Sequence, residues 1–269
     1  MTQNHGPATA GALRLSDAGL GPNRAPAVSR AASVLRLLAG QKSGLGVSEI
    51  ARTLGLVPST CLHVLRALVD EGFIDFDPDR KTYRTGVGLM TLVRDAMASD
   101  EFRTIVQPVL ERLAADYKVT AIAVQLDSRD RMVVVALARF ESPVSLHVNV
   151  GSRFPSLISA TGRCVAAASG LGEAELKDKF AALRWERAPR FEDWYADVEA
   201  ARIEGCAVDR GSYMQGLRIV AALLPSGPER VTRGLALVGL EHNLSDADLT
   251  RQIQNDLVAS ARALANQLG

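Results

Sequence analysis

Four polar side chains recur along one face of a predicted helix in the first third of the chain. Ser59, His63, Arg66 and Asp70 are three or four residues apart, which places them on one side of a helix. The opposite side is apolar and carries Cys61, Leu62, Leu65, Leu68 and Val69. Hydroxyl, imidazole and guanidinium groups on such a face can donate hydrogen bonds to base edges and phosphate oxygens. The pattern is typical of a recognition helix that enters a groove of double-stranded DNA.

Two shorter predicted helices precede this recognition helix and position it. Apolar residues at helical spacing predict a first helix over Val28–Ala39. A second runs from Gly46 to Gly55, with Glu49 placed to cap its first turn. The recognition helix itself runs from Pro58 to Glu71, because a proline fits a first helical turn and a glycine follows the last residue.

A charged hairpin follows the recognition helix. Ile74–Asp77 and Thr82–Thr85 alternate apolar and polar residues around a loop that contains proline and aspartate. Basic side chains at Arg80, Lys81 and Arg84 can lie along a phosphate backbone or reach a minor groove. Together with the helices, this hairpin predicts a winged helix-turn-helix. The alternative is a helix-turn-helix scaffold in a protein–protein module, with solvated charges on the hairpin.

We expect the DNA contacts to come from the recognition helix, the helix before it and the hairpin. Ser59, Thr60 and His63 are placed for the major groove, and basic side chains hold phosphates. The full expected set is Ser48, Arg52, Ser59, Thr60, His63, Arg66, Lys81 and Arg84. Between Arg24 and Met90, nine basic residues stand against six acidic ones. This excess is modest, so we expect affinity to depend on dimeric, site-matched contacts.

The length of 269 residues exceeds the usual size of one domain and favours two. Residues 1–26 lack a basic start and an apolar core, so we expect a disordered arm and not a signal peptide. The winged helix-turn-helix then occupies residues 27–86, a linker helix residues 87–100, and a second domain residues 101–269. No apolar run is long enough to span a bilayer, so we expect a cytoplasmic protein without membrane contacts.

Neither the cysteines nor the histidines suggest a metal centre. Cys61, Cys164 and Cys206 are far apart and are expected to stay reduced. The four histidines do not group with carboxylates or cysteines at ligand spacing. We therefore expect no metal and no cofactor.

After the linker helix, the hydrophobic period changes from helical to strand-like. A helix over Phe102–Tyr117 precedes strands over Val119–Leu126, Met132–Ala138 and Ser145–Val150. Later elements are helices over Thr161–Ala168, Glu173–Leu183 and Glu192–Glu204, strands over Gly216–Leu224 and Thr232–Glu241 around a turn at Ser226-Gly227, and a final helix capped by Ser245 and Asp248. Hairpins with helices packed on one side predict the α+β class.

One segment of the second domain has the chemistry of an anion site. Ser159-Ala160-Thr161-Gly162 lies where the chain enters a helix, and the free N–H groups there favour a carboxylate. The hydroxyls of Ser156, Ser159 and Thr161 add donors, while Gly162 allows close approach of the backbone. Further expected contacts are apolar walls from Leu146, Phe154, Met214 and Leu217 and an acceptor at Asp209.

A purely structural interpretation of these residues is also open. Ser159 and Thr161 can simply cap the helix, Asp209 can hold a turn, and the apolar side chains can belong to the core. Residue by residue the two interpretations are balanced, but for the Ser159–Gly162 segment as a whole we favour a site.

In their order along the chain, several segments resemble the IclR family of bacterial transcriptional regulators. The resemblance covers about Ala27–Gly269. It rests on Gly44–Ala51, Gly55–Thr60 and Leu65–Phe73 in the DNA-binding part, and on Val150–Pro155, Ala160–Arg163, Arg202–Asp209 and Gly216–Ala221 in the second domain.

The resemblance implies a regulator that binds DNA as a dimer, often a dimer of dimers, through its N-terminal domain. Its second domain would be a GAF-like α/β domain that holds a small, frequently acidic metabolite. The family often has arginine at the position of His63 and lysine at that of Arg163, and commonly an acidic residue near Gly211 and a cysteine near Ile219. These departures bear on base preference and on the identity of the ligand.

We therefore expect a non-enzymatic, ligand-responsive transcriptional regulator. A small organic acid bound in the second domain would modulate binding to a palindromic operator, with the linker helix as transmitter. The alternative is a small-molecule-acting enzyme domain fused to a DNA-binding module, although no Ser/His/Asp set, phosphate loop or carboxylate pair emerges. A winged-helix family with a helical, metal-binding sensor disagrees with the strand-rich middle of the chain.

Overall fold

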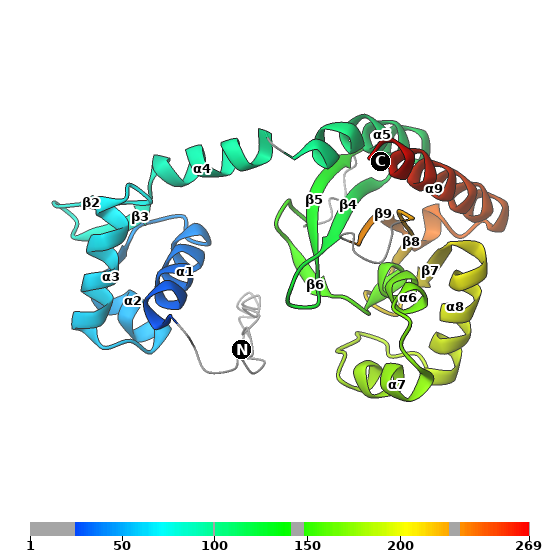
Figure 1. Cartoon of the computed structure of the whole chain (residues 1–269), viewed down its shortest axis with the longest axis horizontal. Helices are drawn as coiled ribbons and strands as arrows, with labels where there is room; N and C mark the ends of the chain where they lie inside the picture. The colour runs from blue at the N-terminus through cyan, green and yellow to red at the C-terminus, as the bar shows by residue number, and fades with distance from the viewer. Residues whose placement is uncertain (1–24, 99, 141–147, 226–231, 269) are drawn as a thin grey trace, which may run out of the picture. The chain divides into compact units, whose positions relative to one another are not determined.

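The computed structural model describes residues 25–98, 100–140, 148–225 and 232–268 of the chain (Figure 1). The chain divides into two compact units, Met1–Ala98 and Ser99–Gly269. Each unit encloses its own hydrophobic core, so each is described by itself.

The N-terminal unit is a helix-turn-helix followed by a β-hairpin. Its elements are α1 (Pro26–Ala39), β1 (Leu45–Gly46), α2 (Val47–Leu54), α3 (Pro58–Asp70), β2 (Ile74–Asp77), β3 (Thr82–Thr85) and α4 (Val87–Ala98). The strands form a three-stranded antiparallel sheet in the order β1–β3–β2. The helices and the hairpin predicted from the spacing are confirmed. The strand β1 has two residues, too few to produce an alternation.

The core of this unit explains why α3 has an apolar and a polar side. The three helices bury Val34, Ile50, Cys61 and Leu65 completely, and Ile74 of β2 packs against the same core. Each of these residues comes from the apolar side of its element. Burial of this side leaves the opposite side of α3 exposed.

The C-terminal unit is built on one large antiparallel sheet. Its elements are α5 (Glu101–Tyr117), β4 (Thr120–Leu126), β5 (Arg131–Arg139), β6 (Arg153–Pro155), α6 (Ser159–Ala168), α7 (Glu173–Ala181), α8 (Phe191–Glu204), β7 (Cys206–Arg210), β8 (Leu217–Leu223), β9 (Arg233–Leu240), the 3-10 turn η1 (Glu241–Asn243) and α9 (Ala247–Gln267). The sheet has six strands in the order β6–β5–β4–β9–β8–β7, and every neighbouring pair is antiparallel.

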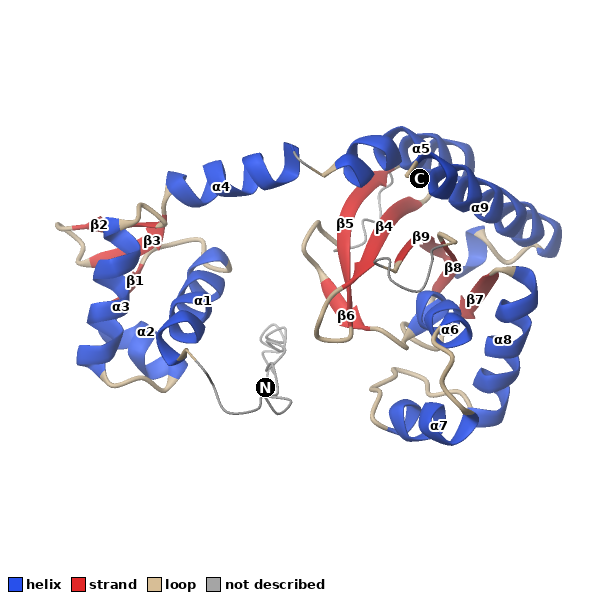
Figure 2. Cartoon of the chain, in the orientation of Figure 1, coloured by secondary structure: helices blue, strands red, loops and turns tan. Residues whose placement is uncertain are grey.

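Helices cover both faces of this sheet (Figure 2). On one face α5 and α9 pack against alternate strand residues such as Ala121, Val220 and Leu237. On the other face α6 and α8 pack against residues such as Ile122 and Ile219. The expectation of helices on one side only is therefore wrong. The central strands are buried on both faces, since six consecutive residues of β8, 217–222, are buried, and such strands need two covering layers.

Several local expectations also need correction. The last helix is capped by Asp246, whose side chain accepts from the Leu249 amide at 2.8 Å, and not by a box of Ser245 and Asp248. In α2 no side chain caps the first turn, so the expected role of Glu49 is wrong. The short strands β6 and β7 were not predicted.

Two expected elements lie partly or wholly outside the described residues. In the expected strand over Ser145–Val150, residues 145–147 lie outside the described residues, and residues 148–150 form no strand. The expected turn at Ser226-Gly227 also lies outside the described residues.

Candidate functional site

The turn between α2 and α3 sets the direction in which α3 leaves α2. Gly55 ends α2 in a left-handed conformation with φ of 64°, which a residue with a side chain rarely adopts. The Leu56 amide donates to the Ala51 carbonyl oxygen at 2.8 Å. Pro58 occupies the first turn of α3. Amides in this turn have no helical carbonyl to donate to, so the missing N–H of proline costs no hydrogen bond.

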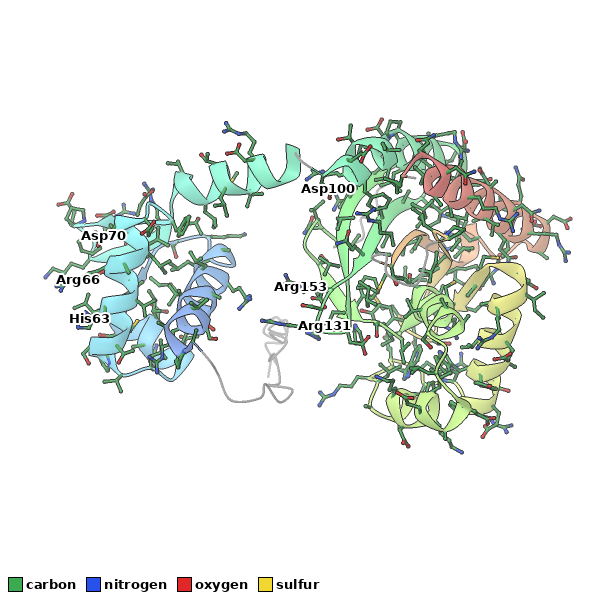
Figure 3. The ribbon with its side chains drawn as sticks, in the orientation of Figure 1. His63, Arg66, Asp70, Asp100, Arg131 and Arg153 are labelled. Atoms are coloured by element: carbon green, nitrogen blue, oxygen red, sulfur yellow. The ribbon has the colours of Figure 1, made fainter. Side chains whose placement is uncertain are left out.

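The polar side of α3 is exposed along its length. Ser59, His63, Arg66 and Asp70 are all exposed, and Figure 3 shows the last three projecting from the same side of the helix. Among the described residues, the side chains of Ser59, His63 and Arg66 have no hydrogen-bond or ion-pair partner. Their hydrogen-bond donors are therefore free to contact base edges and phosphates when α3 lies in a groove of DNA.

The other expected DNA contacts lie on the neighbouring elements. Ser48 and Arg52 are exposed on α2, and Thr60 is half-buried at the start of α3. Lys81 is exposed in the hairpin turn, in a left-handed conformation with φ of 53°. The N-terminal unit thus carries these groups on α2, the start of α3 and the hairpin.

The hairpin is less basic than its lysine and arginines suggest. Arg84 Nε lies 3.5 Å from Asp75 Oδ2, across the β2–β3 pair. Asp77 accepts the amides of Asp79 and Arg80, both at 3.0 Å, and so holds the turn. The three basic side chains at 80, 81 and 84 are matched by aspartates at 75, 77 and 79. A phosphate must therefore compete with Asp75 for Arg84.

The N-terminus of α6 has polar groups that the protein itself does not use. Ser159 and Thr161 are 3% and 2% exposed. The residue preceding the helix is Ile158, and no side chain caps it. Neither hydroxyl hydrogen-bonds to another described residue. The structure therefore does not support the interpretation in which these two residues merely cap the helix. Neither hydroxyl oxygen is among the fully buried polar atoms without a partner, so both stay accessible to water or to a ligand.

Gly162 serves the fold at this point. A Cβ on Gly162 would lie 2.0 Å from the Leu157 carbonyl carbon. This distance is too short for any residue other than glycine at position 162. The Gly162 amide donates to the Ile158 carbonyl oxygen at 2.9 Å. The expected close approach of backbone at Gly162 therefore occurs, but the approaching backbone is that of Leu157.

Asp209 is committed to an ion pair inside the protein. Its Oδ2 lies 2.9 Å from Arg163 Nη1, and its Oδ1 accepts the amides of Ser212 and Tyr213 at 2.9 and 3.2 Å. Asp209 is 0% exposed. Both carboxylate oxygens are thus engaged, and the structure favours the turn-holding interpretation.

Arg163 connects the start of α6 to two other elements. Besides Asp209 on β7, its Nε donates to Asp197 on α8 at 2.9 Å, and its Nη1 donates to the Ser159 carbonyl oxygen at 3.0 Å. The guanidinium also lies over the Trp185 ring, 5.9 Å from the centroid. In the sequence, Arg163 is marked only by the family resemblance, because no periodicity reveals a buried charge.

The expected apolar walls are not gathered in one place. Phe154 is half-buried against the α6 and α8 layer, Leu217 is buried on β8, and Met214 is 45% exposed. Leu146 lies outside the described residues. Two cavities in the described parts, of about 130 and 430 Å³, are lined by other residues. Binding at the α6 N-terminus thus requires space that these two cavities do not provide.

The three cysteines are buried and unpaired. Burial raises the pKa of the Cys164 thiol to about 12 and also raises that of Cys61. Among the described residues there is no group of three metal-ligating side chains. In the same parts of the chain, no helix has the length and apolar character needed to cross a bilayer.

A winged helix-turn-helix with a free donor face, followed by a separate α/β unit, defines the class of DNA-binding transcriptional regulators with a ligand-binding domain. Family models agree: residues 27–78 match the IclR helix-turn-helix domain, and residues 95–266 match the bacterial transcriptional regulator IclR C-terminal domain. The chain belongs to the IclR family of transcriptional regulators.

Individual relatives support this assignment. The chain is 28% identical over 246 residues to the transcriptional regulator XynR of Escherichia coli, covering 88% of this chain and 96% of that protein. An IclR regulator from Alicyclobacillus acidocaldarius matches with a TM-score of 0.78 at 26% identity, covering 92% and 100% of the two chains. An IclR homolog from Microbacterium hydrocarbonoxydans, solved with 4-hydroxybenzoate, shares the fold with a TM-score of 0.67 at 20% identity, covering 88% and 99%.

Proposed function

We propose that this regulator changes its affinity for operator DNA when a small organic acid binds in its C-terminal domain. The observation that carries the proposal is the pair of unpartnered hydroxyls on the mostly buried residues Ser159 and Thr161 at the start of α6. The amides of the first helical turn precede the first intrahelical hydrogen bond and carry partial positive charge. Together these groups suit a carboxylate.

The chemical class of the ligand is supported by a relative as well. The homolog from Microbacterium hydrocarbonoxydans was solved with 4-hydroxybenzoate, an aromatic carboxylic acid. Phe154, which packs against the layer of α6 and α8, is an apolar neighbour that suits a ligand whose remainder is apolar. A small carboxylic acid with an apolar body is therefore our proposed effector for this chain.

On the DNA side, we assign base contacts to Ser59, Thr60 and His63 and phosphate contacts to Arg52, Arg66, Lys81 and Arg84, with Ser48 beside them. These groups are exposed or half-buried on α2, α3 and the hairpin. The modest charge excess of the domain favours two copies on one palindromic operator.

The proposed transmitter between effector and DNA is α4, through contact with a second copy of the chain. This helix exposes three large apolar side chains: Val87, Met90 and Leu92 are 79%, 69% and 57% exposed. Neighbouring apolar side chains exposed in this way are typical of a surface that another protein covers. A second α4 can cover them in a homodimer, or in a dimer of dimers. We place this assembly in the cytoplasm, where it meets DNA.

Calorimetric titration of the full-length protein with a panel of organic acids tests the ligand part of the proposal. Thr161→Val removes one free hydroxyl and keeps the shape, so it should weaken binding of the acid that binds the wild type by about tenfold. Thr104→Val, an exposed threonine on α5, is the matched control and should bind as the wild type does. Equal affinity in Thr161→Val and the control would contradict carboxylate docking at α6.

A further inference from the structure

A polar cavity of about 430 Å³ lies at the turn between β7 and β8, and it has no role in the proposed function. It is lined by Arg187, Arg210, Gly211, Gln215, Gly216 and Glu241. No residue of the Ser159–Gly162 segment borders it. The lining is formed by three separate parts of the chain: the loop before α8, the β7–β8 turn and the start of η1.

The charges around this cavity leave two arginines without partners. Arg187 and Arg210 are exposed, and neither guanidinium has a hydrogen bond or ion pair to another described residue. The acidic residue of the lining is already neutralised, because Arg218 Nη2 and Nε donate to the two oxygens of Glu241 at 2.6 and 3.0 Å. Glu186, next to Arg187, accepts the Gln215 amide at 2.8 Å. Within the lining itself, no carboxylate therefore balances the charges of Arg187 and Arg210, and the carboxylate of Glu186 lies beside them on the Gln215 amide.

The frame that carries the two arginines is fixed by backbone bonds. The Arg187 amide donates to the Ser212 carbonyl oxygen at 3.0 Å, which joins the loop to the turn. The Glu241 amide donates to the Gly216 carbonyl oxygen at 2.7 Å, which joins η1 to the same turn. Gly211 and Gly216 have φ of 79° and 75°, a conformation in which a residue with a side chain would be strained. At these two positions the cavity is therefore lined by backbone atoms alone.

We propose that this cavity is a second ligand site, which binds a small oxyanion between Arg187 and Arg210. Guanidinium groups donate paired, charge-assisted hydrogen bonds to carboxylate and phosphate oxygens. The cavity volume accommodates such an anion together with a polar substituent. The site does not depend on carboxylate binding at α6. It is nonetheless connected to α6, because Arg210 follows Asp209, which pairs with Arg163.

Calorimetry at low ionic strength, with inorganic phosphate and with succinate as separate probes, tests the site on the full-length protein. We expect saturable binding of at least one probe, and the probe that binds identifies the group recognised. Arg187→Gln and Arg210→Gln should each weaken this binding about tenfold, the loss expected for one charge-assisted hydrogen bond. Arg184→Gln, an exposed arginine of the same loop that does not line the cavity, is the matched control and should leave it unchanged.

Thermal unfolding supplies a second readout, since a ligand bound only to the folded state raises Tm. The probe that binds should raise the Tm of the wild type and of Arg184→Gln, but not that of the double variant Arg187→Gln/Arg210→Gln. The site is refuted if neither probe binds, or if the double variant binds as tightly as the control. Because succinate is itself an organic acid, the variants separate the two sites: binding that Thr161→Val weakens and the arginine variants do not belongs to α6, and binding with the opposite pattern belongs to this cavity.

Discussion

Arg163 and Asp209 form an ion pair in the interior of the C-terminal domain, with 2.9 Å between Nη1 and Oδ2 and side chains 3% and 1% exposed. The pair ties the start of α6 to the end of β7. Asp197 on α8 binds the same guanidinium from a half-exposed position. The helix that we propose to hold the effector is therefore anchored to the sheet by buried charge.

This pair gives a stability prediction. Asp209→Ala leaves Arg163 buried with Asp197 as its remaining anionic partner, and removal of one member of a buried pair costs about 3–5 kcal/mol. Urea denaturation should report a lower free energy of unfolding by that amount. The double variant Arg163→Met/Asp209→Leu replaces both charges by apolar groups and should recover part of the loss. If Asp209→Ala unfolds like the wild type, the pair does not anchor α6.

A second prediction concerns Gly162. Gly162→Ala places a Cβ within 2.0 Å of the Leu157 backbone, so the start of α6 must shift. We expect a loss of several kcal/mol, at the upper end of single substitutions, measured as a lower Tm.

Gly172→Ala is the control for Gly162→Ala. A Cβ on Gly172 meets nothing within 4 Å, and replacement of this glycine before α7 should cost about 1 kcal/mol or less. Similar Tm values for the two variants would show that the contact with Leu157 does not constrain position 162.

The hairpin gives a third prediction, on DNA affinity. Asp75 competes with phosphate for Arg84, so Asp75→Asn should raise operator affinity by up to about fivefold, the value of an exposed ion pair. Arg84→Ala should lower affinity equally for all sequences and reduce the slope of affinity against salt by about one. Fluorescence anisotropy over a range of salt concentrations measures both. Weaker binding by Asp75→Asn would rule out this competition.

A fourth prediction separates base contacts from phosphate contacts on α3. His63 lies near the start of the helix and can meet base edges, whereas Arg66 lies one turn further on. His63→Ala should therefore change the preferred half-site sequence, while Arg66→Ala should weaken binding without changing the preference. Selection of binding sites from a random pool, carried out with each variant, measures the preference. The same consensus from His63→Ala and the wild type would remove His63 from the base contacts.

A fifth prediction concerns acid stability. The hydrogen bond from Arg112, followed by that from Tyr117, lowers the pKa of Asp256, which joins α9 to α5. A carboxyl with a lowered folded pKa stabilises the protein above its unfolded pKa of about 3.9, and this contribution is lost as the pH falls further. Asp256→Asn should therefore reduce stability at pH 7 and flatten its decline in acid. An unchanged acid limb of stability against pH would contradict this.

Hydrophobic periodicity predicted most of the secondary structure. The apolar side of α3 was legible because Cys61 and Leu65 recur at helical spacing and are indeed buried. The exposed donors His63 and Arg66 followed from the same period. Strands such as β4 and β8 could be predicted because each is an uninterrupted apolar run of a length typical of a buried strand.

The features that the sequence did not reveal depend on contacts between distant segments. Arg163 and Asp209 are buried only because α6 packs over β7, and neither residue departs from the local pattern. The constraint on Gly162 comes from the Leu157 backbone, which spacing does not express. The strand β6 has three residues and pairs at the sheet edge, so its alternation is too short to detect.

In the mechanism proposed for this regulator, an acid bound at the α6 N-terminus changes operator binding. The most direct test measures operator affinity of the full-length protein with and without a saturating acid, for the wild type and for Thr161→Val. We expect a shift of roughly 5- to 150-fold in the wild type, the usual range of coupling between two sites, and an acid titration displaced to higher concentration in Thr161→Val. Operator affinity that stays constant while calorimetry shows the acid bound would contradict it.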